Sequence, residues 1–87
     1  MSDRMQIIAK LARELEHELS EAKALTRDDR ELLEDLSRDI DRLARYSPSD
    51  AHLLQRLRDA TKRFEVSHPD LTAVTAKIMD TLTRMGI

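Results

Sequence analysis

The sequence of 87 residues has no cysteine and no tryptophan, a single glycine, two prolines and only two aromatic residues, Tyr46 and Phe64. Without cysteine the chain can form no disulfide, thiolate zinc site or cysteine nucleophile, which fits a reducing compartment. One glycine, Gly86, cannot supply the glycine-rich loops that cradle phosphate groups. The scarcity of turn and aromatic residues argues against a β-sandwich or β-barrel.

Neither sign of charge predominates, and long apolar runs are missing. Fifteen Lys and Arg residues face 17 Asp and Glu residues, a formal net charge of -2, which gives no global electrostatic case for binding nucleic acid or an acidic membrane. No run of about 18 apolar residues could span a bilayer, and no targeting segment is recognisable at the N-terminus. We therefore expect a soluble cytoplasmic protein with one small domain, residues 1–87.

What the sequence does have is apolar residues that recur every three or four positions, the pattern of amphipathic helices. Thr26 is a suitable N-cap for the second of four such segments, and Gly86 is placed to end the fourth in a left-handed conformation. Pro48, preceded by Ser47, and Pro69 can each open a helix. The expected helices cover approximately residues 5–22, 26–46, 48–66 and 69–85.

Four helices of similar length with short connections predict an all-α fold, a small antiparallel four-helix bundle. The alternative is a pair of helical hairpins that completes a bundle only by dimerising. Because so small a core yields little stability, self-association would help it. We therefore expect a homo-oligomer, with a dimer favoured.

Two Glu-x-x-His pairs, Glu14 with His17 and Glu65 with His68, have the spacing that holds di-metal carboxylate sites in helical bundles. The first pair lies opposite the apolar stripe of its helix and should face solvent. The second straddles the expected end of the third helix, which spoils its geometry. We therefore predict no metal or other cofactor, and keep a bundle that binds a metal or small ligand near Glu65 and His68 as the alternative function.

Other chemistry finds less support. The serines form no convincing Ser–His–acid group, so we predict that the protein is not an enzyme. Basic residues in the third helix could grip phosphates, but no stacking aromatic accompanies them. A solvated helix face with an Asp59–Arg63 pair explains them better, so a nucleic-acid-associated role is a third hypothesis. The basic residues are Arg56, Arg58, Lys62 and Arg63.

An excess of apolar helix surface is the strongest functional signal. Ile7, Leu11 and Leu25 sit beside the stripe of the first helix, and Met79 and Ile87 lie off the stripe of the fourth. Such residues either widen the core or form an interface. The excess favours a protein-interaction or self-assembly module, with a second copy or an unidentified protein as its partner.

Two short motifs near the C-terminus are more distinctive: Phe64-Glu65-Val66-Ser67-His68-Pro69-Asp70-Leu71 and Met85-Gly86-Ile87. With them the chain resembles the short bacterial proteins grouped as domain-of-unknown-function family 4404. The resemblance implies a small soluble helical protein of bacterial type and brings no activity with it.

The residues that carry the resemblance are candidates for a structural or interaction patch. We expect them to form a helix–helix junction with the C-terminus docked near it. Within it, His68 should cap a backbone group or pack on Phe64. The patch comprises Phe64, Glu65, His68, Pro69, Leu71, Met85, Gly86 and Ile87.

Overall fold

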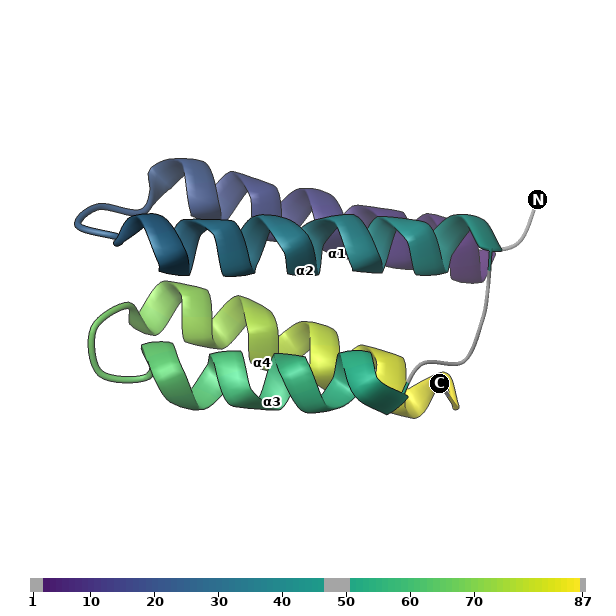
Figure 1. The fold of residues 1–87 in the computed structure, drawn as a ribbon. Coiled ribbons are helices and arrows are strands. Elements are labelled where there is room, and N and C mark those ends of the chain that lie inside the picture. Colours follow the sequence, from purple (N-terminus) through teal and green to yellow (C-terminus); the bar gives the residue numbers. More distant parts are fainter. Residues whose placement is uncertain (1–2, 47–50, 87) are drawn as a thin grey trace.

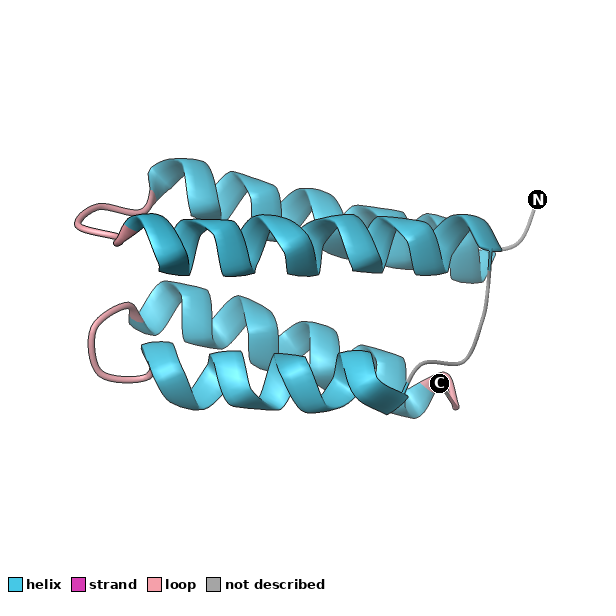
Figure 2. Ribbon diagram, in the orientation of Figure 1, coloured by secondary structure: helices cyan, strands magenta, loops and turns pink. Residues whose placement is uncertain are grey.

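The computed structural model describes residues 3–46 and 51–86, and the side chains of all of these except residues 46 and 51. Within these ranges the chain forms helices and connecting loops without a strand (Figure 2). The all-α prediction is therefore confirmed. The expected helix start at Ser47 and Pro48 lies outside the described residues. The helices are α1 (Asp3–Glu21), α2 (Arg27–Tyr46), α3 (Ala51–Phe64) and α4 (Pro69–Arg84).

The helices form an antiparallel four-helix bundle (Figure 1). α1 packs against α2 and α4, and α3 packs against the same two helices, so the four axes stand at the corners of a square. Packing is closest within the hairpins α1–α2 and α3–α4. Both hairpin loops lie at the same end of the bundle, whereas α1 begins and α4 ends at the other.

Every helix contributes to one apolar core. The radius of gyration is 12.2 Å, close to the roughly 12 Å expected for a compact chain of this length. One chain therefore encloses its own core, and the bundle does not need a second copy to close. The buried apolar residues are Ile8, Leu11, Ala12, Leu15, Leu19, Leu33, Leu36, Ile40, Leu43, Ala44, Leu53, Leu57, Ala60, Phe64, Leu71, Ile78 and Leu82.

Hydroxyl groups between the helices help to define each hairpin. In α1–α2, the buried Ser37 donates a hydrogen bond to Glu16 Oε1 at 3.0 Å. In α3–α4, the hydroxyls of Thr61 and Thr75 lie 2.9 Å apart. Since buried polar groups without partners are costly, these pairs favour one register between the two helices of each hairpin.

The helix ends follow the sequence signals. The Asp29 amide donates to Thr26 Oγ1 at 3.1 Å, which confirms Thr26 as the cap of α2. Gly86 has φ 79°, the left-handed conformation expected after α4. A turn between Phe64 and Pro69 separates α3 from α4, so the chain does not run through His68 as one bent helix.

The core absorbs most of the excess apolar surface. Leu11 is buried, and Leu25 and Met79 are partly buried against the core. Ile7, by contrast, remains 44% exposed, while Ile87 lies outside the described residues. None of the four described helices is long and apolar enough to cross a membrane.

Candidate functional site at the loop end of the bundle

The turn from α3 to α4 is anchored in the core on both sides. Phe64, the last residue of α3, is fully buried, and Leu71 in the first turn of α4 is 1% exposed. Pro69 occupies the first helical position of α4, where its missing amide proton costs nothing. Two of the predicted patch residues, Phe64 and Leu71, therefore lie in the core, and a third, Pro69, begins α4.

The backbone of His68 joins the two helices. Its amide donates a hydrogen bond to the Phe64 carbonyl at 2.8 Å, and its carbonyl accepts from the Thr72 amide at 3.1 Å. The first bond closes the C-terminal turn of α3 and the second begins α4. Although His68 is the N-cap residue of α4, its side chain makes no capping bond there.

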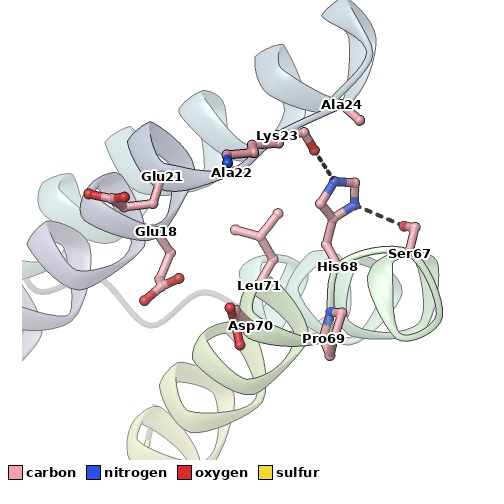
Figure 3. A pocket seen from close by; sticks show the side chains of 10 residues that line it. All are labelled: Glu18, Glu21, Ala22, Lys23, Ala24, Ser67, His68, Pro69, Asp70 and Leu71. Atoms are coloured by element: carbon pink, nitrogen blue, oxygen red, sulfur yellow. Dashed lines mark hydrogen bonds between the residues drawn. The ribbon is translucent and has the colours of Figure 1, made fainter.

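The imidazole of His68 is used elsewhere, as Figure 3 shows. Its ring meets the ring of Phe64 edge-on, with centroids 5.9 Å apart and planes at 78°. Nε2 lies 2.7 Å from the carbonyl oxygen of Lys23 and Nδ1 lies 2.9 Å from the hydroxyl of Ser67. Because a carbonyl can only accept, Nε2 carries the proton and donates it. The side chain of His68 therefore caps a backbone group, the carbonyl of Lys23, and also packs on Phe64. Both roles were expected from the sequence.

Lys23 belongs to the loop between α1 and α2, so His68 connects the two hairpins across 45 positions of sequence. The next residue in that loop, Ala24, has φ 60°. A side chain in the left-handed region costs about 1–2 kcal/mol. The contact from His68 holds a loop whose backbone is strained. We call Phe64, His68, Pro69, Leu71 and the Lys23 carbonyl the His68 junction.

A surface hollow of about 410 Å³ lies between the two loops. Glu18, Glu21 and Asp70 bring three carboxylates to its wall, which His68 also lines (Figure 3). Among the described residues, however, no three acidic or histidine side chains converge on a point where they could hold a metal ion. Glu65 is exposed, and both ring nitrogens of His68 already have partners.

The first Glu-x-x-His pair also has other partners. His17 is exposed, as expected, but Glu14 is only 29% exposed and accepts a hydrogen bond from Lys77 Nζ of α4 at 3.0 Å. The expectation that both residues face solvent is therefore correct only for His17. Glu14 instead joins the two hairpins.

The structure does not bring the two halves of the predicted patch together. Met85 and Gly86 follow the far end of α4, whose 16 residues separate them from Pro69 by about 24 Å. The expectation that the C-terminus docks near His68 is wrong for these two residues, because α4 continues as a straight helix (Figure 1). Ile87 lies outside the described residues.

Half of the basic cluster in α3 is paired with α2. Arg56 forms an ion pair with Asp39, and Arg63 Nε donates to Asp29 Oδ1 at 2.6 Å. The expected Asp59–Arg63 pair is wrong, since Asp59 instead accepts a hydrogen bond from Gln55. These ion pairs reduce the charge that the cluster could offer to phosphates. Sequence reasoning missed them because it cannot read the register between helices.

Fold and site together define a closed, all-α four-helix bundle whose hairpins are joined by a histidine and by ion pairs. Residues 8–87 match the family model described as domain of unknown function DUF4404. The chain belongs to this family. No curated protein and no solved structure matches the chain significantly.

Proposed function

We propose that this protein is a non-enzymatic interaction module that acts in the cytoplasm and associates with a second copy of itself. The observation that carries the proposal is the face formed by α1 and α4. There Ile7 is 44% exposed, about one helical turn before a hollow of about 450 Å³ that Ala73 and Val74 line together with charged residues. An exposed apolar side chain near a hollow that contains further apolar side chains within a charged rim is typical of an interface.

The polar groups at the loop end support a non-enzymatic role. Ser67 and His68 are hydrogen-bonded to each other, which invites comparison with a nucleophile and its base. In such a pair a carboxylate orients the second ring nitrogen. Here the second nitrogen donates to the backbone carbonyl of Lys23, and this hydrogen bond joins the two hairpins. A cysteine-free chain is also suited to a reducing compartment, which favours the cytoplasm.

Light scattering after size-exclusion chromatography tests the proposal on the native chain over a wide concentration range. We expect a mass that rises from 10.1 kDa towards twice that value. A parallel pull-down from host lysate tests a different partner: a second protein retained in fixed proportion keeps the interaction role but replaces the partner. A mass of one chain at millimolar concentration, with nothing retained, contradicts the proposal.

A further inference from the structure

Ser67 differs from the other two serines in the part of the chain that the structure describes, because its hydroxyl contacts an imidazole. Ser67 is exposed, and its Oγ lies 2.9 Å from Nδ1 of His68. Ser20 instead donates to the backbone carbonyl of His17 at 2.7 Å, and Ser37 is buried. Ser67 is therefore an accessible hydroxyl with a nitrogen base beside it.

The tautomer of His68 makes Nδ1 the acceptor in this contact. Nε2 donates its proton to the carbonyl of Lys23 at 2.7 Å, so Nδ1 of the neutral imidazole carries a lone pair. The hydroxyl of Ser67 therefore donates to Nδ1, as the nucleophile of a serine hydrolase donates to its base. The carbonyl of Lys23 fixes the orientation of the ring, which in those enzymes is the task of a carboxylate.

The hollow of about 410 Å³ at the loop end gives a reagent access to this hydroxyl. Ser67 and His68 both line it (Figure 3), and its volume lies in the range of sites that bind small molecules. The charged residues that line it besides His68 are Glu18, Glu21, Lys23 and Asp70. Their net charge is negative, which favours the positive charge that the imidazole gains with a proton and disfavours an anionic reagent. The hollow therefore suits an uncharged reagent.

We propose that Ser67 is a modification site that takes an acyl group from a neutral carboxylic ester, with His68 as the general base. Oγ of Ser67 bonds to the carbonyl carbon of the ester while its proton passes to Nδ1 of His68. The bond between that carbon and the leaving oxygen then breaks, and the leaving oxygen takes the proton from Nδ1. The products are an O-acylated serine and an alcohol, and the imidazole is neutral again.

This modification adds one acyl group to each chain. The group that orients the ring of His68 is the uncharged carbonyl of Lys23 rather than the carboxylate of a serine hydrolase. That difference favours a single acylation over repeated turnover, in keeping with a non-enzymatic module. The step takes place within one chain, so it does not depend on self-association.

Acetylation by p-nitrophenyl acetate, mapped by tandem mass spectrometry, tests the proposal on the native chain. Ser20, which is also exposed and lies in α1, is the internal control in the same sample. We expect Ser67 to be acetylated about 100-fold faster than Ser20, a gain in the range that a positioned general base supplies. Equal rates at the two serines overturn the proposal, and so does an acetyl group on His68 in place of Ser67.

Two histidine variants test the base. His68→Gln removes the ring nitrogen that accepts the proton of Ser67, whereas His52→Gln removes an exposed imidazole on α3. We expect the rate at Ser67 to fall to that of Ser20 in His68→Gln and to keep its native value in His52→Gln, with native helix content by circular dichroism in both. A native rate in His68→Gln, or an equal fall in the two variants, overturns the role of His68. If His68→Gln loses helix content, the comparison of the two serines in the native chain still decides.

Discussion

Nε2 of His68 lies 2.7 Å from the carbonyl oxygen of Lys23, and this bond links the loop of one helical hairpin to the loop of the other. The same imidazole packs on Phe64, which is fully buried at the end of α3. His68 therefore fixes how the two hairpins meet at this end of the bundle.

His68→Ala removes both the hydrogen bond to Lys23 and the edge-on ring contact. Each is worth about 0.5–1.5 kcal/mol, so the free energy of unfolding should fall by roughly 1–2 kcal/mol and Tm by about 5–15 °C. Urea denaturation followed by circular dichroism measures the change. His52→Ala is the control, because His52 is exposed on α3. Equal stability of the two variants would remove the structural role of His68.

Phe64→Leu keeps an apolar side chain at the end of α3 but removes the ring against which His68 packs. Loss of buried volume and of the ring contact should cost about 1–3 kcal/mol. Val66→Leu, two residues along and 91% exposed, should change stability by less than about 0.5 kcal/mol. Urea denaturation measures the free energy of unfolding of both variants. A Phe64→Leu variant as stable as Val66→Leu is inconsistent with a packed junction.

Ala24→Gly should stabilise the protein, because Ala24 has φ 60° in the α1–α2 loop. Relief of the left-handed strain, less the greater entropy of glycine in the unfolded chain, leaves a gain of up to about 1 kcal/mol. Ala73→Gly, at an exposed position inside α4, should destabilise by about 1 kcal/mol. Urea denaturation should therefore show a higher free energy of unfolding for Ala24→Gly and a lower one for Ala73→Gly. A lower value in both variants would count against strain in the loop.

A double-mutant cycle can locate the partner of Arg63. Its ion pair with Asp29, which is 17% exposed on the side chain, should give a coupling free energy of about 0.5–1 kcal/mol that falls as salt is added. The cycle with Asp59, built from Arg63→Gln and Asp59→Asn, should give a value near zero. Both cycles use the free energies of unfolding. A larger coupling with Asp59 would support the pairing within α3 and refute the one between helices.

The sequence predicted the fold well, because periodicity and punctuation are local signals. The spacing of the leucines predicted the helices, and Thr26, Pro69 and Gly86 marked ends that the structure confirms. Contacts between helices were not predictable in this way. Arg63 has an acid four residues before it in its own helix, yet it pairs with Asp29, 34 positions away.

The candidate site was predicted only in part, because contacts within one helical turn can be inferred from the sequence and contacts between hairpins cannot. Phe64 and His68 are four residues apart, so their contact follows from one helical turn. The bond from His68 to Lys23 depends on how two hairpin loops meet, which one sequence does not reveal. Met85 was wrongly expected beside the junction because two motifs that mark the same family were assumed to lie together. The straight helix α4 keeps them apart.

Self-association through the α1–α4 face is tested most directly by the dimer Kd of Ile7→Glu and of a matched control, Val66→Glu. Both positions carry exposed large apolar side chains, Ile7 at 44% and Val66 at 91%. Ile7 lies on the α1–α4 face, whereas Val66 lies in the turn between α3 and α4. A charge in place of Ile7 should therefore weaken self-association, and the same charge in place of Val66 should not.

Sedimentation equilibrium gives the dimer Kd of the native chain and of both variants. We expect Val66→Glu to dimerise like the native chain and Ile7→Glu to raise the dimer Kd by about tenfold or more. A native chain that stays at 10.1 kDa, or an Ile7→Glu variant with the native Kd, would contradict self-association through this face.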